Sequence, residues 1–166
     1  SKQFPSVAVL GCSDSRVPVE LVFDQGLGDL FVVRVAGNAL DMSTTASLQF
    51  AVHHLKVKVL MVMGHEACGA VRAAGLPIKA IEGEPQALSS CLKVIKAGLD
   101  CDRAEKLKDH RARDREMVVQ NVYAQLDGLT HDVGIMEKVA KGELLIVGAH
   151  YELSSGIVDF FSEVSM

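Results

Sequence analysis

Three short apolar runs that each end at a glycine limit the folds open to this chain most strongly. They occupy residues 7–11, 59–64 and 144–148. Their apolar residues follow one another without alternation, which is typical of strands covered on both faces in a parallel sheet. Leu30–Val35 is a fourth candidate strand, and residues 157–161 are predicted to add a closing edge strand.

A helix is predicted over residues 43–55 because their apolar side chains recur every three or four positions. This stripe consists of Leu48, Ala51, Val52 and Leu55. Phe50 lies off the stripe. We therefore expect this helix to contact a second partner besides the sheet, such as another subunit.

Further helices are predicted between Pro18 and Gly26, over residues 118–129 and over residues 134–141. Residues 102–116 are dominated by charges, which is typical of a solvated helix face rather than a binding site. Strands that alternate with helices predict an α/β layered sheet with right-handed crossovers. The expected fold has a parallel four-strand core plus an edge strand, with helices on its faces, and residues 1–166 form a single domain.

Composition excludes several classes of partner and location. Seventeen basic and 21 acidic residues give a net charge of −4, so no nucleic-acid partner is expected. The longest apolar run, over residues 57–63, is far too short to span a membrane, and a soluble protein is expected. Four cysteines without dense spacing indicate a reducing compartment, either the cytoplasm or an organelle interior.

Cys12 and His65 each directly follow the glycine that closes a predicted strand. Ligands of parallel sheets bind beyond the carboxyl ends of the strands, so both side chains should enter the same crevice. Cys68 lies three residues after His65 and can add a third ligand. Two thiolates and one imidazole suit Zn²⁺, and three protein ligands leave a fourth position open, as in catalytic zinc sites.

Asp14 and Arg16 leave the state of that fourth position undecided. Arg16 can bind a carboxylate through two parallel hydrogen bonds. If Arg16 holds Asp14, the fourth position takes water, whereas an Asp14 that turns to the metal becomes the fourth ligand and closes the site. We expect the open state during turnover, because an added carboxylate weakens the pull of the metal on its water.

The other histidines are weaker candidates for the metal site. His53, His54, His110 and His131 have no ligand context and are expected at the surface. His150 follows a strand and its glycine, and it is kept as a secondary candidate. A metal-free alternative uses Cys12 as a nucleophile at a helix N-terminus.

The motifs of this chain resemble those of the β-class carbonic anhydrases. The matching segments span nearly the whole chain and are residues 12–18, 23–31, 33–34, 36–38, 47–48, 51–52, 64–65 and 68–71. A weaker match follows at residues 148–152.

The resemblance implies a zinc enzyme that interconverts CO₂ and bicarbonate by attack of zinc-bound hydroxide. Its zinc ligands are Cys12, His65 and Cys68, and its orienting dyad is Asp14 with Arg16. The resemblance also implies a homodimer or tetramer with its active site at the dimer interface. The substrate-binding positions that it assigns are Phe31, Ala36, Phe50 and Gly69.

Two departures from the family pattern keep alternatives open. Family members usually carry an N-terminal arm, whereas eleven residues precede Cys12 here. Glu66 replaces a small polar residue and places a carboxylate beside the metal motif, where it is expected to alter proton transfer or zinc charge. The alternatives are a non-catalytic zinc-binding homologue that is capped by Asp14, and a hydrolase of a small linear molecule such as carbon disulfide.

Overall fold

The computed structural model describes residues 2–164 and contains a five-stranded sheet in the order β2-β1-β3-β4-β5. The strands are β1 (Val7–Cys12), β2 (Leu30–Val35), β3 (Val59–His65), β4 (Leu145–Tyr151) and β5 (Val158–Val164). The first four are parallel, and β5 pairs antiparallel with β4. This arrangement confirms the predicted parallel core with one edge strand.

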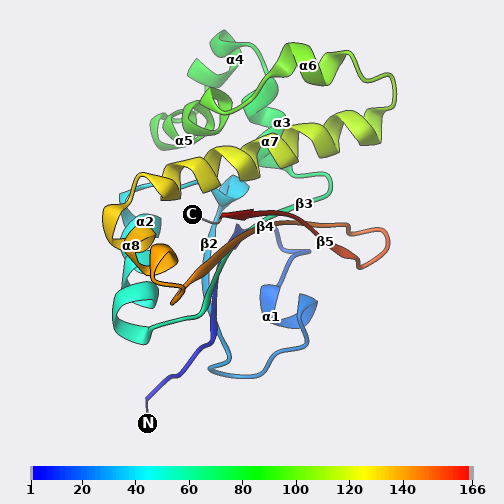
Figure 1. Cartoon of the computed structure of the whole chain (residues 1–166). Helices are drawn as coiled ribbons and strands as arrows, with labels where there is room; N and C mark the ends of the chain where they lie inside the picture. Colours follow the sequence, from blue (N-terminus) through cyan, green and yellow to red (C-terminus); the bar gives the residue numbers. More distant parts are fainter. Residues whose placement is uncertain (1, 165–166) are drawn as a thin grey trace.

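Helices fill the connections between the strands (Figure 1). They are α1 (Val19–Val22), η1 (Ala36–Asn38), α2 (Met42–Phe50), η2 (Ala51–Leu55), α3 (Gly69–Gly75), α4 (Ile78–Glu82), α5 (Gln86–Ala97), α6 (Cys101–Glu105), α7 (His110–Thr130) and α8 (Val133–Ala140). Within residues 2–164, no helix has both the length and the apolar character required to cross a bilayer.

Two predicted helices differ from the structure. The single helix expected over residues 43–55 changes at Ala51 from α-helical to π-helical winding, a local change that an apolar stripe does not report. The charged stretch 102–116 is divided between α6 and α7, and Asp109 begins α7 by accepting a hydrogen bond from the Ala112 N–H. The apolar stripe predicted over residues 118–129 lies within α7.

Alternate strand residues pack on opposite sides of the sheet. Leu10 and Leu60 belong to a core with residues of α2, η2, α7 and α8, whereas Val9 and Met61 pack with Val19 of α1 on the other side. Figure 1 shows α7 running over the sheet with α4, α5 and α6 beyond it, and α1 below the sheet. The sheet is therefore covered on both faces, as the continuous apolar runs predicted.

The helix α7 approaches β3 at Gly64. A Cβ atom at this position would lie 2.5 Å from Cγ1 of Val118 and 3.0 Å from Cγ2 of Val122, both on α7. These separations are too short for a carbon contact. Glycine at residue 64 therefore sets the distance between the sheet and α7, one residue before His65.

Replacing Gly64 by alanine is predicted to destabilise the fold by about 1–3 kcal/mol, because the added methyl group overpacks the contact with α7. The free energy of unfolding measured in urea tests this. Gly83→Ala is the matched control, because its Cβ would lie 3.4 Å from its nearest neighbour, and its free energy should change by less than about 0.5 kcal/mol. Equal stability of both variants would contradict the prediction.

Candidate metal centre

Three buried side chains that come from two strand ends and the following loop meet at the carboxyl edge of the sheet. Cys12 is the last residue of β1, His65 is the last residue of β3, and Cys68 immediately precedes α3. The ligand atoms of all three lie within 4.8 Å of one another, and the two sulfurs are 4.0 Å apart. The structure thus brings together the three residues that the sequence nominated, as a group able to hold a metal ion.

The imidazole of His65 is oriented by a backbone carbonyl. Its Nδ1 lies 2.9 Å from the carbonyl oxygen of Glu66, which can only accept, so Nδ1 carries the proton. Its Nε2 is buried and has no hydrogen-bond partner within residues 2–164. A buried nitrogen lone pair without a partner is unfavourable in a folded protein, and a metal ion held by the neighbouring sulfurs would satisfy it.

Thiolate chemistry at Cys12 is favoured by two hydrogen bonds. The Cys68 thiol contacts the Cys12 sulfur, which lowers the pKa of Cys12 and raises the pKa of Cys68. The backbone N–H of Gly37 donates to the same sulfur at 3.3 Å. Gly37 has a φ of 72°, and a Cβ there would lie 2.5 Å from Cδ1 of Ile95. Only glycine fits this position.

Asp14 and Arg16 form a closely bonded pair next to the metal-binding group. The carboxylate of Asp14 accepts hydrogen bonds from Arg16 N, Nε and Nη2 at 2.9, 2.9 and 2.7 Å. These bonds hold the pKa of Asp14 well below its usual range. Oδ2 of Asp14 lies 3.8 Å from Nε2 of His65. The carboxylate is thus beside the centre while it is bonded to Arg16.

Two arginines hold the loops that carry these groups. Arg34 on β2 donates to the carbonyl oxygens of Cys12 at 2.9 Å and Asp14 at 2.6 Å. Arg16 Nη2 also donates to the carbonyl oxygen of Ala67 at 3.2 Å. Neither contact was predicted, nor was the Gly37 bond to sulfur, although Arg34 and Gly37 lie within segments that match the family pattern.

The predicted substrate-binding residues fall into two pairs. The rings of Phe31 on β2 and Phe50 on α2 have centroids 6.2 Å apart, and His54 stacks on Phe50 at 5.2 Å. Ala36 adjoins Gly37 in η1, and Gly69 follows Cys68 as the first residue of α3. Phe50 is 45% exposed, as its position off the apolar stripe predicted.

The carboxylate of Glu66 is bonded to residues outside the metal-binding group, although the place of Glu66 beside the motif led us to expect an effect on proton transfer or zinc charge. Its carboxylate accepts hydrogen bonds from the Ser154 N–H at 2.9 Å and from Arg111 Nη2 at 3.0 Å. The Ser154 N–H holds the pKa of Glu66 below its usual value. A sequence pattern could not find these partners, because they are 88 and 45 residues away.

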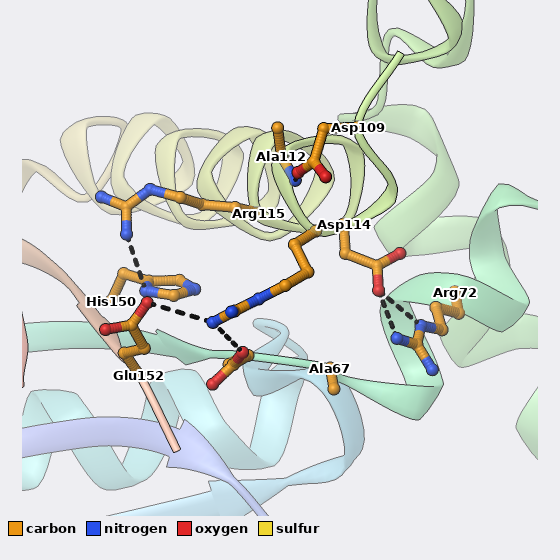
Figure 2. A pocket seen from close by; sticks show the side chains of 10 residues that line it. Ala67, Arg72, Asp109, Ala112, Asp114, Arg115, His150 and Glu152 are labelled. Carbon is orange, nitrogen blue, oxygen red and sulfur yellow. Dashed lines mark hydrogen bonds and ion pairs between the residues drawn. The ribbon is translucent and has the colours of Figure 1, made fainter. Parts of the chain in front are cut away.

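His150 is buried in a separate cavity, whereas His53, His54, His110 and His131 are at the surface as expected. The cavity, of about 460 Å³, is lined by charged residues from α7 and the ends of β3 and β4 (Figure 2). Nη1 of Arg115 lies 3.2 Å from Nδ1 of His150. Burial and then the charge of Arg115 lower the pKa of His150 from 6.5 to about 4.

This depressed pKa predicts a loss of stability in mild acid. The unfolded chain binds a proton at residue 150 before the folded chain does, so the contribution of His150, complete above about pH 6.5, is lost as the pH falls towards 4. The loss is about 3 kcal/mol at most. His150→Asn should therefore flatten the dependence of unfolding free energy on pH between these values, and equal slopes in urea titrations would contradict this.

Comparison with known proteins agrees with the geometry of the site. A family profile described as carbonic anhydrase matches residues 7–158. Carbonic anhydrase 2 of Mycobacterium tuberculosis is 36% identical over 163 residues, which cover 93% of this chain and 73% of the relative. A carbonic anhydrase of Mycolicibacterium smegmatis is 37% identical, and the matched region covers 98% of this chain and 77% of the relative.

Solved structures show the same fold. A tetrameric β-carbonic anhydrase of Sordaria macrospora superposes with a TM-score of 0.90 at 28% identity, covering 99% of this chain and 84% of that chain. The Coccomyxa β-carbonic anhydrase in complex with acetazolamide gives a TM-score of 0.85 at 28% identity, with coverages of 99% and 76%. Together with the close approach of Cys12, Cys68 and His65, these matches show that the chain belongs to the β-carbonic anhydrase family.

Proposed function

We propose that this chain is a zinc enzyme that interconverts carbon dioxide and water with bicarbonate and a proton. The observation that carries the proposal is the meeting of the sulfurs of Cys12 and Cys68 with a His65 nitrogen that has no hydrogen-bond partner among residues 2–164. Tetrahedral zinc with Zn–S bonds of about 2.3 Å needs sulfurs about 3.8 Å apart. The separation of 4.0 Å between the two sulfurs fits this requirement.

Cys12, His65 and Cys68 would hold the zinc, which when bound would lower the pKa of a water molecule and so supply a nucleophile near neutral pH. Arg16 keeps Asp14 ionised and holds its carboxylate through three hydrogen bonds. These bonds favour a fourth coordination position that Asp14 does not occupy. While it is held by Arg16, Asp14 would accept a hydrogen bond from the nucleophilic oxygen and orient it towards the substrate carbon. The proton released by the reaction passes to solvent.

Carbon dioxide is small, linear and apolar, and it needs a surface that does not compete through charge. We assign this surface to Phe31, Phe50, Ala36 and Gly69, none of which carries a polar side chain. The aromatic pair offers an apolar contact, and the two small residues leave room beside the metal-binding loops. Bicarbonate is charged and interacts with such a surface less well, which favours its departure.

Cys12→Ser and His65→Ala are predicted to lose both the metal and the activity, because each removes one ligand. Asp14→Asn should keep the metal and lower the rate of hydration by about 10- to 100-fold, since it weakens an orienting group beside an intact centre. Metal analysis after dialysis and stopped-flow CO₂ hydration measure these outcomes. A zinc-replete wild-type protein that shows only the buffer rate at alkaline pH would remove the enzymatic proposal.

Measurements on the same zinc-replete protein distinguish the hydratase from two alternatives. A non-catalytic zinc protein capped by Asp14 should show carboxylate oxygen as fourth ligand at every pH in X-ray absorption. The bonds between Asp14 and Arg16 favour the open state instead. Parallel assay of carbon dioxide and carbon disulfide distinguishes a hydratase from a hydrolase of the second substrate.

We infer that the chain self-associates as a homodimer or tetramer. The similar protein from Sordaria macrospora is described as tetrameric. Several large apolar side chains are also exposed here, including Leu27, Ile157 and Phe160, and an interface between subunits would bury such surface. Sedimentation at micromolar concentration should give a dimer or a larger species, and a monomer throughout would refute the inference.

A further inference from the structure

The turn between His65 at the end of β3 and Cys68 just before α3 has an uncommon backbone conformation. Ala67 has a φ of 57°, in the left-handed region that residues with a Cβ rarely adopt. Such a conformation is unfavourable by about 1–3 kcal/mol and persists only where the surrounding structure holds it. The turn determines where His65 and Cys68 lie relative to each other, so the groups that hold it act on the metal-binding geometry.

Glu66 is bonded through both its backbone and its side chain. Its N–H donates to the carbonyl oxygen of Tyr151 at 2.8 Å, and its own carbonyl oxygen accepts from Nδ1 of His65 at 2.9 Å. Its carboxylate accepts from Ser154 N at 2.9 Å and from Arg111 Nη2 at 3.0 Å. Three of these contacts thus fix Glu66 to β4, to the turn after it and to α7, and the fourth joins it to His65 of β3.

The carboxylate and the carbonyl of Glu66 point in different directions. The side chain reaches towards the charged cavity in which Figure 2 shows Glu152 and His150, whereas the carbonyl faces the imidazole of the metal-binding group. Because the side chain is tied to Ser154 and Arg111, the peptide that carries the carbonyl cannot rotate freely. On the far side of the turn, Arg16 holds the carbonyl oxygen of Ala67 at 3.2 Å.

We propose that Glu66 is a positioning residue, which fixes the ring orientation and the Nδ1-protonated form of His65 by fastening the turn between His65 and Cys68. The role rests on the proposed metal function but requires no turnover. Glu66 contacts neither the sulfurs nor Nε2 of His65, so it acts through its own carbonyl. Arg111 assists from the first turn of α7.

The test measures metal affinity and ligand geometry in Glu66→Ala and Glu66→Gln. Chelator competition gives the zinc dissociation constant, and the visible absorption of the cobalt(II)-substituted protein reports the coordination geometry. Glu66→Ala should weaken zinc binding by about 10- to 100-fold, as is typical when a group that orients a metal ligand is removed. It should also change the cobalt spectrum. Glu66→Gln retains an acceptor for the Ser154 N–H and should lose less affinity.

Glu82→Ala is the matched control, because Glu82 forms an exposed ion pair with Lys93 at 3.3 Å. It should bind zinc as the wild type does. Circular dichroism and thermal unfolding of the metal-free variants show whether the fold survives. Should Glu66→Ala not fold, Glu66→Gln and Arg111→Gln decide, and each should weaken binding measurably.

Wild-type zinc affinity and an unchanged cobalt spectrum in Glu66→Ala would overturn the proposal, as would equal losses in Glu66→Ala and Glu82→Ala. If Glu66→Ala does not fold, wild-type affinity in both Glu66→Gln and Arg111→Gln would overturn it. Stopped-flow hydration by the wild type is measured separately. A wild-type protein that binds zinc without hydrating CO₂ would refute the proposed function. The zinc affinities of the variants would still decide the role of Glu66.

Discussion

The parallel pairing of β1 with β3 is the constraint on which the rest of the site depends. Backbone hydrogen bonds align Val7 with Val59, so the two strands end at the same edge. The side chains that follow their last apolar residues therefore meet, although they are more than fifty positions apart in the sequence. Alternate residues of both strands pack in two different cores, so a shift of one residue would move each side chain into the opposite core and disrupt the packing of both.

Burial also determines what this edge can bind. Two sulfurs and one imidazole are withdrawn from water at the same place, and the imidazole nitrogen has no partner within residues 2–164. Such a group is unfavourable unless a cation compensates for it. The nearby carboxylate of Asp14 is engaged by Arg16. Under the proposed function, a bound metal would compete with this guanidinium for the carboxylate in the loop after β1.

The sequence predicted the parts that depend on local pattern. Continuous apolar runs identified the strands, and the residues after each glycine identified Cys12 and His65. The change of winding at Ala51, the break between α6 and α7 and the partners of Glu66 were not predicted. They depend on packing and on contacts between distant segments, which periodicity does not encode. The substrate-binding role of Phe31 and Phe50 stays a prediction.

The shared contacts of Arg16 have a consequence for how this centre tolerates variation. One guanidinium joins a carboxylate to the backbone of the segment that separates two ligands. Under the proposed function, the orientation of the reacting oxygen and the spacing of the ligands would therefore depend on the same side chain. A lysine has the charge but not the flat, forked shape, so it could not maintain both at once. Natural divergence at position 16 should be accompanied by compensating change in the loop that contains Ala67.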